Sequence, residues 1–199
     1  MNDKDIVSMT EYVVEHKPLR IILIGYMGAG KTTVGRALAR ELNVPFYDLD
    51  WYIESRMRKT VKQIFDEKGE EGFRRIEQSM LHEVAEFENV IVSCGGGTPC
   101  FFDNMEYMNG QAETVYLKAE ADVLYKHLLM GRSVRPLLLN KTPDEVDSFI
   151  REQLKYRESF YTKAKHILDV SLMDNYAKID ISVNQLCQLL KLNKANYQK

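Results

Sequence analysis

Residues 20–42 read RIILIGYMGAGKTTVGRALAREL, and this segment carries the strongest structural signal in the chain. It opens with the run RIILI at 20–24, which is typical of a strand buried on both faces. A glycine-rich loop follows, and Val34, Leu38 and Leu42 then recur at four-residue spacing, as on the apolar stripe of a helix. The segment therefore predicts a strand, a tight loop and an amphipathic helix in succession.

The loop, Gly25–Thr32, matches the pattern GxxxxGK[ST], which cradles nucleotide phosphates when it lies between a strand and a helix. Glycines let consecutive backbone N–H groups turn toward an anion without obstruction by Cβ atoms, and the start of the helix adds a positive dipole. Lys31 is expected to reach the β- and γ-phosphates, and Thr32 to bind Mg²⁺. This context favours a nucleotide site over a glycine-rich turn that only caps a strand. The residues expected to bind nucleotide are Gly28, Ala29, Gly30, Lys31, Thr32 and Thr33.

Composition limits the remaining function classes. The 199 residues are enough for one compact domain, and 27 basic against 29 acidic side chains leave a net charge of −2. The basic surplus of a typical nucleic-acid binder is absent, and no apolar run approaches the roughly 20 residues that span a bilayer. The N-terminus lacks the pattern of a secretory signal. The odd number of cysteines, Cys94, Cys100 and Cys187, argues against a disulfide framework. We expect a cytoplasmic protein that binds neither nucleic acid nor membrane.

Strand and helix signals alternate along the rest of the chain, which predicts βαβ crossovers and an α/β fold in three layers. Further strands are expected at 44–48, 90–93, 114–117 and 166–170, with a turn at Asn109-Gly110. A capping box at Thr60–Gln63 opens a short helix that Gly69 ends. Helices are also expected over about 73–87, from 142 toward 164, and around 183–192.

Two pairs of charged residues could take part in chemistry. Asp48 and Asp50 would point the same way if the second strand continues, and could assist Mg²⁺ and accept a hydroxyl proton. A solvated turn explains this pair equally well. Arg74 and Glu77, three residues apart on a helix, could orient the guanidinium toward a carboxylate ligand, although a solvated ion pair is the commoner outcome.

Three later features each have a functional and an ordinary structural explanation. Gly95–Gly97 follows a strand, so a ligand could approach its backbone closely, or it could be a simple turn. The segment RPLL at 135–138 lies between two predicted helices and could belong to a mobile lid or to a connecting loop. Arg157 lies one helical turn before Tyr161 and could bind a ligand or remain a surface charge.

Taken together and in this order, the motifs resemble the shikimate kinase family over about residues 19–192. The phosphate loop alone is shared by many NTPases, but the ordered set is specific. The matching motifs are GxxGxGKTT at the loop, Asp48-Leu49-Asp50, FRRIE at 73–77, GGG at 95–97, RPLL at 135–138 and RxxxY at 157–161.

The resemblance implies a P-loop kinase fold, with a five-stranded parallel sheet and helices on both faces. It implies transfer of phosphate from ATP to the 3-hydroxyl of shikimate, on the route to chorismate and the aromatic amino acids, with Mg²⁺ as cofactor. The implied catalytic residues are Lys31, Asp50 and Arg135, of which Arg135 also faces ATP. The implied shikimate-binding residues are Asp50, Arg74, Gly96 and Arg157, and the implied Mg²⁺ residues are Thr32 and, through water, Asp48.

The resemblance also implies a domain plan and exposes one departure from the family. Residues 1–18 would be an N-terminal extension, and 19–199 a single kinase domain, acting as a monomer, with a substrate-binding subdomain at about 50–81 and a lid at about 129–142. Family members commonly carry another ATP-facing arginine a turn or two before the lid motif, where this chain has Leu128, with Lys126 and Arg132 as the nearest cations. The family's adenine loop, near 174–178, is not clearly matched either.

Two other functions remain open from the sequence. Another small-metabolite kinase, acting on gluconate or a nucleoside monophosphate, would share the architecture. A non-catalytic nucleotide-binding module would keep the loop alone, and the presence of acceptor-site residues argues against it. A helicase fits worse, because the net charge is −2 and the chain is too short for tandem motor domains.

Overall fold

The computed structural model describes residues 18–130, 142–171 and 176–192, so most of the expected N-terminal extension and lid, Arg135 included, lies outside it. Five strands form one parallel sheet in the order β2-β3-β1-β4-β5, as predicted. The strands are β1 (Arg20–Ile24), β2 (Phe46–Asp48), β3 (Val90–Ser93), β4 (Glu113–Lys118) and β5 (His166–Asp169).

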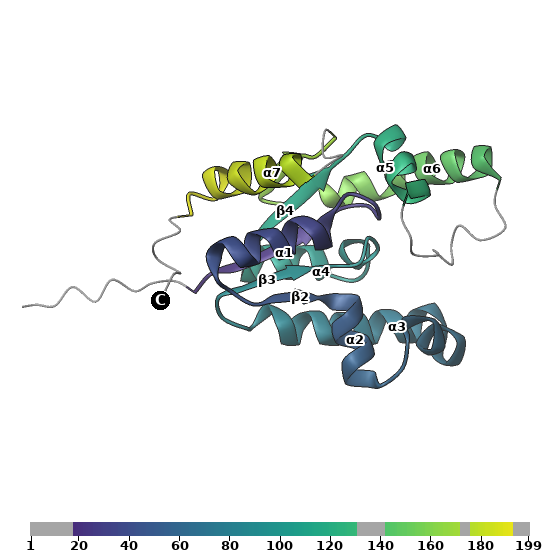
Figure 1. Ribbon diagram of the computed structural model, residues 1–199. Helices are drawn as coiled ribbons and strands as arrows, with labels where there is room; N and C mark the ends of the chain where they lie inside the picture. The colour runs from purple at the N-terminus through teal and green to yellow at the C-terminus, as the bar shows by residue number, and fades with distance from the viewer. Residues whose placement is uncertain (1–17, 131–141, 172–175, 193–199) are drawn as a thin grey trace, which may run out of the picture.

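Helices cover both faces of this sheet (Figure 1). The connection from β1 to β2 runs in one direction along the sheet and the later connections run in the other, so right-handed crossovers place their helices on opposite faces. One face carries α1 (Lys31–Leu42), with α7 (Tyr176–Leu189) beside it. The other helices are α2 (Leu49–Met57), α3 (Val61–Ala85), α4 (Asn104–Gln111), α5 (Ala121–Met130), α6 (Pro143–Tyr161) and the short 3₁₀ helix η1 (Thr98–Cys100).

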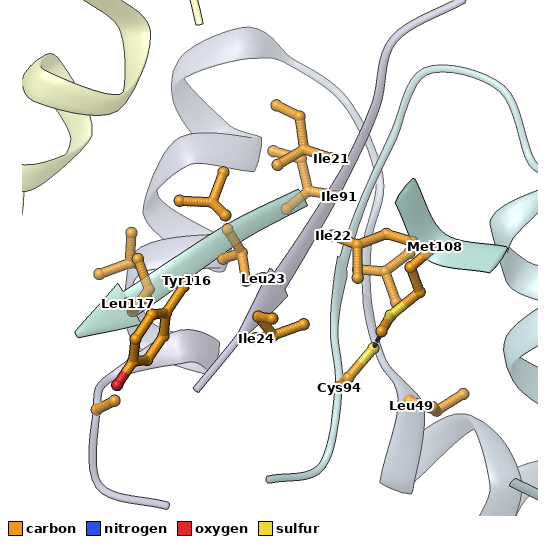
Figure 2. Packing of buried hydrophobic residues seen from close by; sticks show 14 of the residues in the cluster. Ile21, Ile22, Leu23, Ile24, Leu49, Ile91, Cys94, Met108, Tyr116 and Leu117 are labelled. Atoms are coloured by element: carbon orange, nitrogen blue, oxygen red, sulfur yellow. Dashed lines mark hydrogen bonds between the residues drawn. The ribbon is translucent and has the colours of Figure 1, made fainter. Parts of the chain in front are cut away.

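The core lies along the central strands (Figure 2). Ile21, Ile22, Leu23 and Ile24 are at most 1% exposed, which confirms that β1 is buried on both faces. Each such side chain contributes roughly 1.5–3 kcal/mol on burial. The carboxyl ends of β1 and β3 are thereby held rigidly at one edge of the sheet, where the loops that follow them meet.

Local signals set several helix ends as predicted. Thr60 and Thr142 each form a full capping box at the start of α3 and α6. Gly69 has φ 68° and ψ −178°, so the helical path breaks there and α3 consists of two segments. The segment of α3 after Gly69 carries Phe73 and Arg74 toward the end of the sheet where the strands finish.

The second strand ends at Asp48, as predicted, because Asp48 caps the N-terminus of α2 by accepting from the backbone N–H of Trp51. Two other predictions of local structure are wrong. Asn109 and Gly110 lie inside α4 rather than in a turn, since Met105 and Met108 of that helix pack in the core. Helix α7 begins at Tyr176, earlier than expected. No helix in the described ranges is long and apolar enough to cross a membrane.

Candidate active site

The phosphate loop connects the end of β1 to the start of α1. Gly25 has φ 138°, and a Cβ there would lie 2.7 Å from the Leu117 carbonyl oxygen, so only glycine fits. Gly30 caps α1 in the left-handed region without any side-chain hydrogen bond to the helix. The first N–H groups of α1 are therefore left for a ligand, and the helix dipole favours an anion.

Lys31 and Thr32 extend from the first turn of α1. The Lys31 ammonium, on a residue only 9% exposed, donates to the carbonyl oxygens of Gly25 at 2.8 Å and Tyr26 at 3.0 Å. The Thr32 hydroxyl donates to a carboxylate oxygen of Asp48 at 2.9 Å. A hydroxyl and a carboxylate beside a phosphate-binding helix end are the hard oxygen donors that Mg²⁺ prefers, so these residues fit that ion.

Asp50 lies in the first turn of α2, next to the glycine segment after β3. The residue is exposed to solvent, although its carboxyl lies among many protein atoms. These surroundings and the neighbouring carboxylates of Asp48 and Glu77 raise the pKa of Asp50 to about 6, against the opposing effect of Lys31. The carboxylate is mostly ionised at pH 7 but can take up a proton readily.

Arg74 belongs to a buried network and not to a solvated surface pair. Its guanidinium donates to Glu77 at 2.8 Å and lies 3.9 Å from the centroid of the Phe101 ring. Glu77 is 1% exposed and accepts a second hydrogen bond, at 2.7 Å, from the hydroxyl of the fully buried Thr98. The Nε atom of Arg74 is buried without a hydrogen-bond partner among the described residues. The network therefore orients the Arg74 guanidinium and leaves it an N–H group that can still donate a hydrogen bond.

Arg157 extends from α6 toward the phosphate loop and the glycine segment Gly95–Gly97. It donates to Gln153 at 2.9 Å, and its guanidinium carbon lies 5.5 Å from the centroid of the Tyr26 ring. The Tyr161 hydroxyl, one turn later, donates to the carbonyl oxygen of Gly96 at 2.6 Å. Burial raises the pKa of Tyr161, so this hydroxyl stays protonated. Helix α6 is thereby fastened to the glycine segment.

The three glycines face three different charged groups. A Cβ on Gly95 would lie 3.1 Å from a carboxylate oxygen of Asp50, and one on Gly96 would lie 3.4 Å from Arg157 Nη1 and from the Gly25 carbonyl oxygen. A Cβ on Gly97 would lie 2.8 Å from Arg74 Nη2. The segment thus brings Asp50, Arg157 and Arg74 together beside the phosphate loop, although they come from α2, α6 and α3.

Sequence reasoning missed several residues of this region. Thr98 follows the glycine segment and looks like an ordinary polar residue until its contact with Glu77 is known. Tyr26 occupies a variable position of the loop pattern, and His127 belongs to no motif. In the structure, Tyr26 lies under Arg157 and His127 contacts the phosphate loop. Leu128, which replaces the expected arginine, packs near Gly28.

Comparison with known proteins gives the family. The family model described as shikimate kinase matches residues 27–190. A shikimate kinase of Phocaeicola vulgatus is 56% identical over 175 residues, covering 88% of this chain and 99% of that protein. A shikimate kinase of Bacteroides thetaiotaomicron is 53% identical over 174 residues, covering 87% of this chain and 99% of that protein.

Solved structures agree with this assignment. The crystal structure of shikimate kinase from Bacteroides thetaiotaomicron has a TM-score of 0.86 at 53% identity, covering 88% of this chain and all of that one. The enzyme from Acinetobacter baumannii, solved in complex with shikimate, has a TM-score of 0.76 at 32% identity and covers 93% of this chain and 97% of that one. A gluconokinase from Sinorhizobium meliloti, at 19% identity and TM-score 0.56, shares the fold alone. With its phosphate loop and ordered motifs, this chain belongs to the shikimate kinase family.

Proposed function

We propose that this enzyme transfers the γ-phosphoryl group of ATP to the 3-hydroxyl of shikimate, producing shikimate 3-phosphate and ADP. One observation carries the proposal. The segment Gly95–Gly97 lies beside the phosphate loop and faces Asp50, Arg157 and Arg74 in turn. Two guanidinium groups and one carboxylate suit an acceptor that has a carboxylate at one end and hydroxyls at the other.

The residues then have distinct roles. Arg74 and Arg157 bind the shikimate carboxylate, Arg74 being oriented by its hydrogen bond to Glu77. Asp50 accepts a hydrogen bond from the 3-hydroxyl and takes up its proton as the oxygen attacks. The new bond joins this oxygen to the γ-phosphorus, and the bond from that phosphorus to the β–γ bridging oxygen breaks, which leaves ADP. The pKa of Asp50, about 6, suits a base that works near neutral pH.

The nucleotide side depends mainly on the phosphate loop. Lys31, now bonded to the carbonyls of Gly25 and Tyr26, would turn toward the β- and γ-phosphates when ATP binds. The remaining nucleotide contacts in the proposal are Gly28, Ala29, Gly30, Thr32 and Thr33. Phosphoryl transfer needs mostly positioning and charge neutralisation, and a buried ammonium supplies both.

Mg²⁺ and the lid complete the proposal. Thr32 and, through water, Asp48 would hold Mg²⁺, and the hydrogen bond between them supports this pairing. The ion would supply positive charge opposite the β- and γ-phosphates. Arg135, in the lid at about 129–142, would face the transferred phosphate; this part rests on the family's sequence pattern.

The domain plan and setting are part of the same proposal. We infer a single domain from residue 19 onward, with a substrate-binding subdomain at about 50–81, preceded by an N-terminal extension over 1–18. We also infer a monomer in the cytoplasm that binds ATP and shikimate and needs no nucleic acid or membrane. The odd cysteine count supports a reducing compartment.

An acceptor panel tests the function directly. ADP release is measured with ATP and Mg²⁺ in the presence of shikimate, gluconate or a nucleoside monophosphate, with a no-acceptor control for ATP hydrolysis. We expect release with shikimate only, and nuclear magnetic resonance of the product should show phosphate at the 3-position. Turnover with gluconate or a nucleotide and none with shikimate would overturn the proposal. ATP binding without turnover of any acceptor would favour a non-catalytic module.

A further inference from the structure

Helix α5 contacts the outside of the phosphate loop through two adjacent side chains. His127 Nδ1 lies 2.9 Å from the carbonyl oxygen of Gly28, a contact across 99 positions of sequence. Leu128 packs on the same glycine, since a Cβ built there would lie 3.3 Å from Leu128 Cγ. The loop is therefore held from outside by a helix that belongs to another crossover.

The chemistry of this contact fixes the direction of the hydrogen bond. A backbone carbonyl oxygen only accepts, so His127 must carry its proton on Nδ1 and donate it. The Gly28 carbonyl belongs to the peptide that also carries the Ala29 N–H, and a trans peptide points these two groups in opposite directions. The Ala29 N–H donates to the Tyr26 carbonyl oxygen at 3.2 Å, across the loop. His127 thus bonds the carbonyl side of this peptide from α5, while the N–H turns into the loop, where it is bonded to Tyr26 and would exchange that bond for one to a phosphate.

An inward N–H is what a phosphate loop needs. Phosphate binding depends on successive N–H groups that already point into the loop before the ligand arrives. Gly28 has φ 87°, a region that glycine enters freely, so the orientation of its peptide depends on hydrogen bonds rather than on steric contacts. The bond to His127 restrains the carbonyl side of this peptide, in addition to the turn bond on its N–H side.

We infer that His127 is a positioning residue for nucleotide binding, which holds the Gly28–Ala29 peptide in its phosphate-binding orientation without touching the nucleotide. The inference rests on the proposed function only in requiring that the loop binds ATP. Leu128 packs on the same loop beside the histidine that bonds it.

Two substitutions at His127 separate the effect of its hydrogen bond from the effect of its side-chain volume. His127→Asn keeps a donor close to the position of Nδ1, and His127→Leu keeps bulk without a donor. Asp122→Asn, an exposed residue on the same helix whose partner is Arg151 of α6, is the matched control. The dissociation constants of ADP and ATP are measured by calorimetry, together with the thermal midpoint and the KM and kcat for both substrates.

We expect His127→Leu to weaken ADP and ATP binding about tenfold, as the loss of one hydrogen bond implies. KM for ATP should rise accordingly, while KM for shikimate stays within about twofold. His127→Asn should recover most of the affinity, and Asp122→Asn should match the wild type. Unchanged nucleotide affinity in His127→Leu, or an Asn variant as impaired as the Leu variant, would overturn the inference.

A second measurement uses the unaltered protein. Nitrogen nuclear magnetic resonance reports which ring nitrogen of His127 carries the proton in the neutral imidazole, and we expect Nδ1. A proton on Nε2 alone would refute the inference even if the Leu variant failed to fold. Weak ADP binding in His127→Leu, in an enzyme that does not phosphorylate shikimate, would overturn the proposed function and leave this inference standing.

Discussion

Replacing Thr98 with valine should remove one hydroxyl from the buried network behind Arg74 and change little else. Valine has nearly the shape of threonine, and Thr98 is fully buried, so no water can take the place of the lost donor. The hydroxyl donates at 2.7 Å to Glu77, which in turn accepts from Arg74 at 2.8 Å. The substitution therefore leaves a carboxylate that is 1% exposed with one donor fewer.

The expected magnitude follows from the charge and burial of Glu77. A hydrogen bond to a charged group contributes about 1.5–3 kcal/mol, roughly twice the value for a neutral pair. At about 1.4 kcal/mol per tenfold change, the loss corresponds to roughly 10- to 150-fold in an equilibrium constant. Part of this should lower the free energy of unfolding, and part should weaken shikimate binding, because Glu77 no longer holds Arg74 in one orientation.

Steady-state kinetics and urea denaturation measure the two parts. We expect KM for shikimate to rise about tenfold in Thr98→Val, KM for ATP to stay within about twofold, and the free energy of unfolding to fall by the remainder, at most about 1.6 kcal/mol. Thr98→Ser, which restores the hydroxyl, is the matched control and should recover most of both losses. The reasoning is refuted if Thr98→Val keeps the shikimate KM and stability of the wild type, or if the Ser variant is as impaired as the Val variant.

The remaining predictions concern the groups nearest the reaction. Lys31→Ala should lower kcat by about 10²–10³, or roughly 3–4 kcal/mol, in single-turnover assays; near-normal turnover would contradict its role. Arg157→Lys should raise KM for shikimate far more than KM for ATP, because lysine keeps the charge but loses the planar fork, and equal effects on both would indicate a structural role. The profile of kcat/KM against pH should rise through about 6, since protonated Asp50 cannot accept the hydroxyl proton, and Glu77→Gln should shift this limb to lower pH. The pKa of Asp50 is raised in the folded state, so its negative charge opposes folding increasingly from about pH 4 to pH 6 and fully above pH 6. Asp50→Asn should therefore unfold at a higher urea concentration than the wild type at pH 7. A lower urea midpoint would contradict the raised pKa.

Much of the architecture and part of the site can be predicted from the sequence because local interactions determine them. The run at 21–24 is apolar throughout, which favours a strand covered on both faces, and the glycine pattern after it admits a loop that side chains would block. The capping boxes at Thr60 and Thr142 satisfy their own helix ends, and Gly69 breaks α3 by its backbone conformation. Each of these features depends on residues within a few positions of one another.

The tertiary structure decided what depends on distant neighbours. The two-residue spacing would place Asp48 and Asp50 on one face only if the second strand continued; instead Asp48 caps α2, and Asp50, in the first turn of that helix, lies beside Gly95. The spacing of Arg74 and Glu77 is equally typical of a surface ion pair, and only the burial of Glu77 and its hydrogen bond from Thr98 show that the pair belongs to a buried network. Burial and long-range hydrogen bonds arise from segments many residues apart, so no local pattern reports them; they appear only when the sheet brings the ends of its strands to one edge.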